Sequence, residues 1–97
     1  MKIWIVFGTT GEYLDRTEWA VKAFRDQDRA RKFEHECLDE GERIERYMRT
    51  NRLYRFDIGK HPELIHKLDS GFQLDYNTGT DYFIISVELE DDKIEQT

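Results

Sequence analysis

Three stretches of the chain have the hydrophobic pattern of a β-strand, either as a short apolar run or as alternating apolar and polar residues. Residues 2–7 are rich in β-branched and aromatic side chains, and residues 17–24 resume the pattern after a polar, glycine-containing stretch. These two stretches predict a β-hairpin with an enlarged loop over 9–16, in which Trp19, Val21 and Ala23 share one face. Residues 82–89 alternate most regularly and predict the last strand.

A helical period begins after Asp26, whose carboxylate can accept the free amide hydrogens of a first helical turn. The apolar residues that follow recur at spacings of three, four and seven, which places them on one stripe: Ala30, Phe33, Cys37, Ile44, Tyr47 and Met48. Gly41 falls on this stripe and costs about 1 kcal/mol relative to alanine. The pattern favours one helix bent at Gly41 over two helices joined there.

Pro62 suits the first position of a short helix that buries Leu64, Ile65 and Leu68 and ends at 69–71. Residues 72–76 alternate again and predict a strand joined to the last one by a turn at 77–80. The sum is an α+β fold in two layers, β-β-α-(α)-β-β, with an antiparallel sheet of three to four strands and helices on one face. We expect one domain over 1–97, a frayed acidic tail over 90–97, and the apolar first and last strands at the centre of the sheet.

The charge of the chain indicates which partners it can bind, and its cysteine content indicates a cellular compartment. The chain of 97 residues has 15 basic and 21 acidic side chains, and residues 57–97 alone carry three basic against ten acidic. Such a surface repels nucleic acid phosphates and attracts basic protein surfaces. One cysteine forms no internal disulfide and fits a reducing cytosol. With no apolar run near 18 residues and no signal-peptide cleavage pattern, we expect a cytoplasmic protein without a membrane partner.

The usual catalytic and metal-binding signatures are absent from the sequence. His35, His61 and His66 lack metal-ligand spacing with one another or with Cys37, so surface or capping roles are expected for them. Cys37 lies on the apolar stripe, which is typical of a buried, inert thiol. There is no phosphate-binding glycine loop and no serine in a nucleophile-elbow context. The sequence therefore predicts no metal, no cofactor, no catalytic residues and no enzymatic activity.

Candidate binding residues gather in the two predicted turns. The first turn contributes Glu12, Tyr13, Asp15, Arg16, Glu18 and Trp19, and the second contributes Asp75, Tyr76, Thr78, Thr80, Asp81 and Tyr82. Carboxylates, a guanidinium and aromatic rings in such loops can grip a partner, or they can hold the loop's own shape through internal hydrogen bonds. Both readings stay open. If the two hairpins lie side by side, both turns contribute to one surface.

Five arginines, Arg43, Arg46, Arg49, Arg52 and Arg55, recur at every third position. Steps of three rotate by about 300° in an α-helix, so these residues wind around the helix and form no single flat face. A solvated helix with ion pairs to nearby glutamates explains them. A ridge that contacts phosphates is the alternative, although a nucleic-acid-binding protein usually shows a clearer excess of basic residues.

Residues 7–19, which include Gly11-Glu12-Tyr13-Leu14-Asp15-Arg16-Thr17-Glu18-Trp19, resemble the opening of a group of small phage and prophage proteins. Those proteins begin with a strand, continue with Gly-Glu-Tyr-x-Asp-Arg-x-Glu-Trp and enter a helix through an aspartate. Residues 75–82, followed by Val87-Glu88-Leu89, are similar to their closing strand pair. The resemblance implies a viral or prophage accessory protein that binds a host factor stoichiometrically, with anti-CRISPR and other defence-system inhibitors as the most specific case. It implies no catalytic residues.

Three functional hypotheses follow. The leading one is a phage- or prophage-encoded binding protein that inhibits or modulates a bacterial protein, by contacts from the two turns and the acidic C-terminal part. One alternative is a small-ligand protein, such as a sponge for a nucleotide signal, because aromatic rings at Trp4, Tyr13, Trp19 and Tyr82 can stack on bases. The other is a nucleic-acid-binding accessory protein that uses the arginines. A homodimer is compatible with all three, since a small sheet leaves an edge strand to pair.

Overall fold

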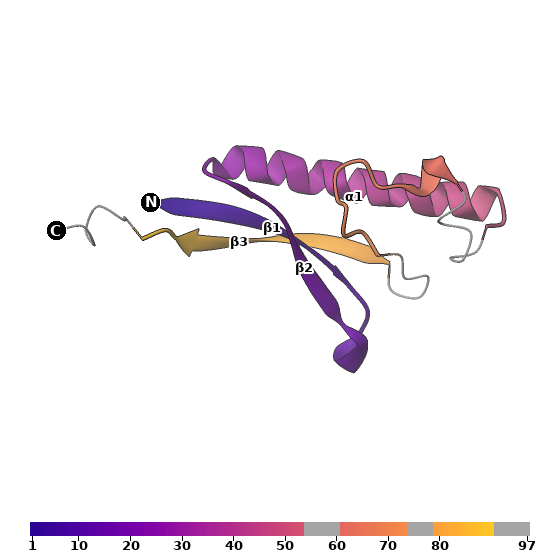
Figure 1. The fold of residues 1–97 in the computed structure, drawn as a ribbon, viewed down its shortest axis with the longest axis horizontal. Coiled ribbons are helices and arrows are strands. Elements are labelled where there is room, and N and C mark those ends of the chain that lie inside the picture. Colours follow the sequence, from indigo (N-terminus) through magenta and orange to yellow (C-terminus); the bar gives the residue numbers. More distant parts are fainter. Residues whose placement is uncertain (54–60, 74–78, 91–97) are drawn as a thin grey trace.

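The computed structural model describes residues 1–53, 61–73 and 79–90, which form an antiparallel sheet with a long helix across one face (Figure 1). The strands are β1 (Lys2–Thr10), β2 (Thr17–Phe24) and β3 (Thr80–Glu88). The helix is α1 (Gln27–Thr50), and two single-turn 3-10 helices, η1 (Tyr13–Asp15) and η3 (Pro62–Leu64), lie in the connections. This arrangement in two layers confirms the predicted α+β fold class.

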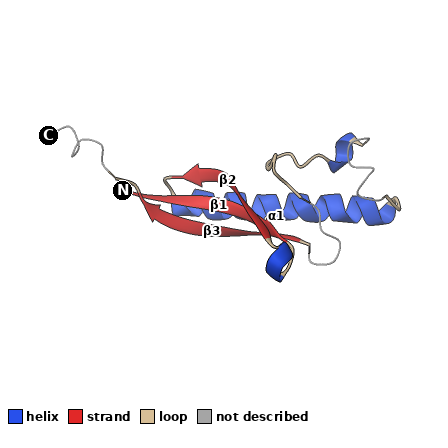
Figure 2. Ribbon diagram, turned by 60° about the horizontal axis from the view of Figure 1, so that its bottom comes forward, coloured by secondary structure: helices blue, strands red, loops and turns tan. Residues whose placement is uncertain are grey.

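The strand order is β2-β1-β3, with both neighbours antiparallel to β1 (Figure 2). The predicted hairpin of β1 and β2 is confirmed, and β1 is central as expected. The expectation that the last strand is also central is wrong within the described sheet, because β3 lies at an edge. β3 is apolar although it lies at an edge. Three of its apolar residues, Phe83, Ile85 and Val87, lie on the sheet face away from α1.

A β-bulge in β2 changes which residues of that strand face the helix. The pairing with β1 shifts by one residue between Val6 and Phe7, which leaves Val21 as the extra residue. The expectation that Trp19 and Ala23 share one face is therefore wrong. Trp19 faces the helix side, whereas Ala23 faces away from it.

The helix begins where the sequence predicts, because the Asp26 carboxylate accepts the Asp28 amide hydrogen at 2.9 Å. A single helix is confirmed, but the bend expected at Gly41 is not present, because Figure 1 shows no sharp kink along α1. Its buried stripe consists of Ala30, Phe33, Cys37, Gly41, Ile44 and Met48. A Cβ atom at Gly41 would lie 3.2 Å from the Phe72 ring, so the missing side chain lets Phe72 pack closely against the helix.

The core between the helix and the rest of the protein forms two clusters. The first joins α1 to the sheet through Val6, Ala30, Phe33, Cys37 and Tyr82. The second contains Ile44, Met48 and Leu64, and it lies where the connection 61–73 covers the C-terminal half of α1. Because the sheet covers the N-terminal half and this connection covers the rest, α1 is buried along one side over its whole length.

The connection differs from the predicted short helix. It starts at Pro62 as expected but ends at Leu64, and Ile65 and Leu68 are 63% and 40% exposed where burial was expected. His66 and Asp69 are buried in their place. Polar residues displace apolar ones from the interior here because hydrogen bonds, described below, satisfy them.

Of the predicted strand 72–76, Phe72 and Gln73 lie in no strand, and 74–76 fall outside the described residues. Most of the predicted acidic tail, 91–97, also falls outside them. No helix among the described residues has the length and apolar character needed to cross a membrane.

Candidate functional site

The first predicted binding cluster lies at the end of the β1–β2 hairpin, around η1. Glu12, Asp15, Arg16 and Glu18 are exposed there, and Tyr13 begins η1. The Arg16 guanidinium lies 2.9 Å from the Glu18 carboxylate, and the Asp15 amide donates to the Glu12 carbonyl at 3.0 Å. These charged side chains are therefore within reach of a partner, while backbone contacts help to hold the loop.

The second predicted cluster is described only in part. Thr80, Asp81 and Tyr82 begin β3, whereas Asp75, Tyr76 and Thr78 lie outside the described residues. The Thr10 hydroxyl donates to the Gly79 carbonyl at 2.8 Å, and the Thr80 hydroxyl donates to the Gln73 carbonyl. The Thr17 hydroxyl reaches the Gln73 side chain at 3.4 Å. The hairpin end and the start of β3 thus meet at the same end of the sheet.

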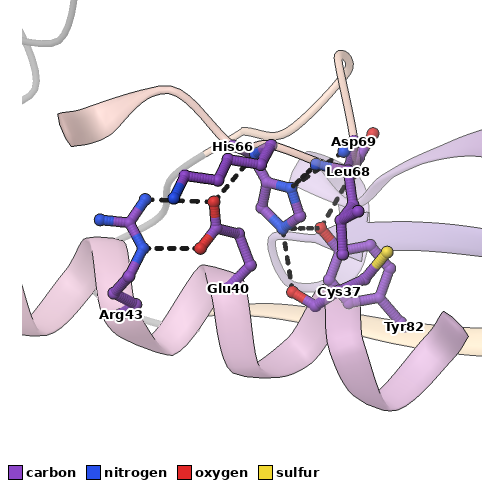
Figure 3. Close-up of polar contacts among 8 residues, drawn as sticks. Cys37, Glu40, Arg43, His66, Leu68, Asp69 and Tyr82 are labelled. Carbon is purple, nitrogen blue, oxygen red and sulfur yellow. Dashed lines mark hydrogen bonds and ion pairs between the residues drawn. The ribbon is translucent and has the colours of Figure 1, made fainter. Parts of the chain in front are cut away.

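Trp19 and Tyr82, both predicted as binding residues, direct their polar atoms to the buried carboxylate of Asp69. Trp19 Nε1 donates to the two Asp69 oxygens at 3.1 and 2.9 Å. The Tyr82 hydroxyl donates to Asp69 Oδ2 at 2.8 Å (Figure 3). The Gly71 amide donates to Oδ1 at 3.0 Å. Asp69 is only 2% exposed, so these bonds replace the water that a carboxylate otherwise needs.

His66 fixes the same connection to the helix. Its Nδ1 accepts the amide hydrogens of Leu68 and Asp69 at 3.1 and 2.9 Å. Because Nδ1 accepts, the ring proton is assigned to Nε2, which donates to the Cys37 carbonyl of α1 at 2.9 Å (Figure 3). The expected capping role of a histidine is thus present at His66, but in a buried position.

Burial at this polar network shifts the pKa of two side chains. Burial, with smaller contributions from the negative charges of Asp69 and Glu36, raises the pKa of the Cys37 thiol to about 12. Burial and the hydrogen bond to Asp69 also raise the pKa of Tyr82. Both groups keep their protons near neutral pH, so neither supplies an anionic nucleophile. Across the described ranges, no group of three or more histidine, cysteine or acidic residues is placed to hold a metal ion.

A second polar contact attaches the connection to α1. Arg43 donates from Nε to Glu40 Oε1 at 2.6 Å, and the Lys67 amide donates to Glu40 Oε2 at 2.9 Å (Figure 3). The Arg43 hydrogen bond is the main reason why the pKa of Glu40 is lowered to about 2. Arg43 is therefore engaged within the fold, and Arg55 of the same series lies outside the described residues.

The opposite face of the sheet is apolar, and we call it the open face. It consists of Ile3, Ile5 and Phe7 of β1, Phe83, Ile85 and Val87 of β3, and Ala20 and Ala23 of β2. The Phe7 and Phe83 rings stack at a centroid distance of 5.3 Å, while Ile85 and Val87 are each 42% exposed. Helix α1 packs on the other side of the sheet (Figure 2). Within the described part of the chain, no helix covers the open face.

Acidic residues mark one end of the open face. Glu18 and Asp81 both pair with Thr9, one from each side, and both are exposed. The other end, around Ile3 and Val87, is apolar. The open face is therefore an apolar strip that ends beside the Asp81 carboxylate and the ion pair of Glu18 with Arg16.

Among the hollows on the helix side of the described residues is one of about 390 Å³ between α1 and the connection, beside Glu36, Arg43 and Leu68. Two others bear on ligand binding. One, of about 170 Å³, lies beside Ile44, Leu64 and Phe72, and it is smaller than the roughly 300–1,000 Å³ of ordinary small-molecule sites. The other is a groove of about 490 Å³ between α1 and β3, lined by Trp4, Gln27, Arg31, Glu34, His35, Ile84 and Ser86. Trp4 lines this groove, whereas Trp19 and Tyr82 bond to Asp69, so these aromatic residues do not form one stacking site.

Comparisons of the chain with protein-family models, with curated proteins and with solved structures find no match.

The open face is the feature that sequence reasoning missed, although a signal was present. Residues 3–7 are apolar at five consecutive positions, so both faces of this strand are apolar. The long helix can cover only one of them. The role of Asp69 had no comparable signal, because it precedes Ser70 and Gly71 in a stretch typical of a turn.

Proposed function

We propose that this chain is a phage- or prophage-encoded, non-catalytic binding protein that inhibits or modulates a bacterial host protein. An inhibitor of a bacterial defence system, in the manner of an anti-CRISPR protein, is the most specific form of this proposal. The proposed origin is supported by the resemblance of residues 7–19, 75–82 and 87–89 to small phage accessory proteins. The proposed binding role is supported by the open face.

The open face carries the proposal because large apolar patches on a small protein usually mark interaction sites. Its stacked pair, Phe7 and Phe83, offers the kind of aromatic anchor that contributes strongly to protein interfaces. Glu18 and Asp81 at its end favour a partner that presents lysine or arginine beside an apolar patch. The net charge of −6 would further speed association with a basic surface.

Stoichiometric binding fits the structure better than catalysis or nucleic acid binding. The buried Cys37 thiol and Tyr82 hydroxyl hold their protons, which leaves them without nucleophilic character near neutral pH. The carboxylates of Glu18 and Asp81, at the end of the open face, would repel the phosphates of a nucleic acid that approached this face. Arg43, the first residue of the arginine series, is bonded to Glu40.

The proposal is tested by a tagged pull-down from bacterial lysates, with and without nuclease, read by mass spectrometry. Ala20 is exposed beside Phe7 on the open face and makes no part of the core, so Ala20→Lys adds a bulky charge there without a cavity. Thr50→Lys adds the same charge at the exposed end of α1 and is the matched control. We expect a nuclease-resistant protein to be captured by the wild type and by Thr50→Lys, and to be lost with Ala20→Lys.

The captured protein is then assayed with increasing amounts of the chain. Its activity should change until the two proteins are equimolar and remain constant beyond that point, because a non-catalytic binder acts by occupancy. A partner that resists Ala20→Lys would contradict the role of the open face. Capture that disappears with nuclease would favour the nucleic-acid-binding alternative instead.

A further inference from the structure

The two edge strands of the sheet differ in their protection against pairing with another strand. The β2 edge is interrupted by the bulge at Val21 and carries charged residues, including Lys22, within its length. The β3 edge pairs regularly with β1 over nine residues, and its charged residues, Asp81 and Glu88, lie near its two ends. Bulges and charges are the usual devices that block edge pairing. The β3 edge lacks them at its centre.

The backbone of β3 shows which groups this edge presents. The Leu89 amide donates to the Met1 carbonyl, so the odd-numbered residues of this segment bond to β1. Backbone amides and carbonyls of successive residues in a strand point to opposite edges, so those of Ile84 and Ser86 point away from β1. In the described part of the chain, β1 is the one strand that pairs with β3. The Tyr82 amide, which also points outward, is satisfied locally by Asp81 Oδ1 at 2.8 Å.

We propose that β3 pairs antiparallel with β3 of a second copy of this chain, with a two-fold axis at Ile85. In this register Ile84 exchanges both backbone hydrogen bonds with Ser86 of the second copy, and the symmetric pair repeats them. The two sheets join into one sheet of six strands. Both helices then lie on the same side, because the axis is perpendicular to the sheet.

Side chains on the two faces fit this register. On the open face, Ile85 lies opposite its own copy and Phe83 lies opposite Val87, which are favourable cross-strand pairs of apolar residues. On the helix side, Ile84 lies opposite Ser86 and Glu88 lies opposite Tyr82. No like charges come directly opposite each other.

The groove between α1 and β3 adds charge complementarity. It is lined by Ile84 and Ser86, so it lies at the level of the proposed axis, and Arg31 and Glu34 are on its helical wall. Two-fold symmetry reverses the direction of the second helix, which brings Arg31 of one copy toward Glu34 of the other. A surface that carries both charges near the axis is self-complementary, as a two-fold interface requires.

The mass in solution tests the proposal first, by light scattering coupled to size-exclusion chromatography at about 10–200 µM, where homodimers of ordinary affinity are populated. We expect twice the chain mass of 11.8 kDa. Ser86→Pro removes the outward amide of residue 86 without affecting the bonds to β1. Because both copies carry the substitution, the dimer loses two hydrogen bonds. The substitution should weaken the dimer by about tenfold or more. Ala23→Pro makes the same change on the outer edge of β2 and should leave the dimer intact.

Cysteine cross-linking tests the register. Residues 85 of the two copies would face each other as a non-hydrogen-bonded pair with Cα atoms about 4.5 Å apart, a distance that a disulfide can span. Ile85→Cys should therefore form a covalent dimer with oxidised glutathione as the oxidant. Val87→Cys should not, because residues 87 would be separated by four positions, roughly 13 Å. The native Cys37 is buried and is present in both variants.

Several results would overturn the inference. A monomer at about 200 µM would contradict pairing of ordinary affinity. Loss of the dimer with Ala23→Pro but not with Ser86→Pro would move the interface to β2, and cross-linking at 87 instead of 85 would exclude the proposed register. Far-ultraviolet circular dichroism of each variant shows whether the fold is retained. These outcomes are independent of the pull-down, so dimerisation and host binding can fail separately.

Discussion

Both faces of the three-stranded sheet carry apolar side chains, but they differ in coverage and in polar groups. On the helix side, polar groups of Trp19 and Tyr82 are gathered around the buried carboxylate of Asp69. On the open face, Ile85 and Val87 are 42% exposed and have no polar neighbour in their strand pairs with Ile5 and Ile3. The buried face therefore combines an apolar core with a polar network, whereas the open face keeps apolar side chains partly exposed.

This contrast shows that coverage by a second layer, rather than polarity, decides which side of the sheet is core. A carboxylate is tolerated inside because three donors satisfy it, one of which, Trp19 Nε1, is shared between its two oxygens. Apolar residues are tolerated outside because most folded surfaces contain apolar atoms. A contiguous strip of them is different and suggests a surface that is covered in a complex.

The largest expected effect comes from removing the carboxylate at the centre of the buried network. Asp69→Ala leaves Trp19 Nε1, the Tyr82 hydroxyl and the Gly71 amide without their acceptor. Each buried group that loses its partner costs about 1–3 kcal/mol, so we expect a loss of about 3 kcal/mol or more in the free energy of unfolding. Urea denaturation followed by tryptophan fluorescence measures this loss.

A matched control for this variant is Asp39→Ala, which removes an exposed carboxylate from the same helix-side layer. It should change the free energy of unfolding by less than about 0.5 kcal/mol. Asp69→Asn keeps one acceptor oxygen and should fall between the two. If Asp69→Ala and Asp39→Ala change the free energy of unfolding equally, the network does not stabilise the fold.

The fold could largely be predicted because its determinants are local. Alternation gave the hairpin and the last strand, and Asp26 with the stripe after it gave the helix. The errors lie where tertiary contacts override local pattern. The bulge at Val21 separated Trp19 from Ala23, and hydrogen bonds with distant residues buried Asp69. Neither event has a signature in the spacing of residues.

The candidate site was predictable only in part for a related reason. Polar residues in turns predict contacts with a partner, and the structure shows that Glu12, Asp15 and Glu18 are exposed. Trp19 and Tyr82 are in the same segments, but their polar atoms serve the fold. From sequence alone, aromatic and charged residues in turns are expected to be free to contact a partner. Whether they are depends on which face of the sheet the second layer covers.

The contrast between the two faces is measured directly by one substitution made on each of them. Val6→Ala and Val87→Ala remove the same two methyl groups, from a side chain that is 0% exposed and from one that is 42% exposed. Val6→Ala should cost about 2 kcal/mol because the surrounding core does not close the cavity fully. Val87→Ala should cost less than about 1 kcal/mol. Similar losses in urea denaturation would mean that the open face is covered in the free protein.

The smallest expected effect is a loss of stability at low pH, and it comes from the contact of Glu40 with Arg43 on the helix side. The hydrogen bond from Arg43 lowers the pKa of Glu40 from 4.5 to about 2 in the folded protein. As the pH falls through this window, the unfolded chain takes up the proton before the folded protein does, so stability that is fully present above pH 4.5 is progressively lost.

Because Arg43 is 36% exposed and solvent screens the pair, the loss should be only about 1–2 kcal/mol. Glu40→Gln should lower the free energy of unfolding at pH 7 and flatten its dependence on pH between about 4.5 and about 2. Glu42→Gln removes an exposed carboxylate from the same helix and should leave that dependence as in the wild type. If both variants keep the slope of the wild type, the acid sensitivity originates elsewhere, and the contact of Glu40 with Lys67 and Arg43 does not stabilise the connection.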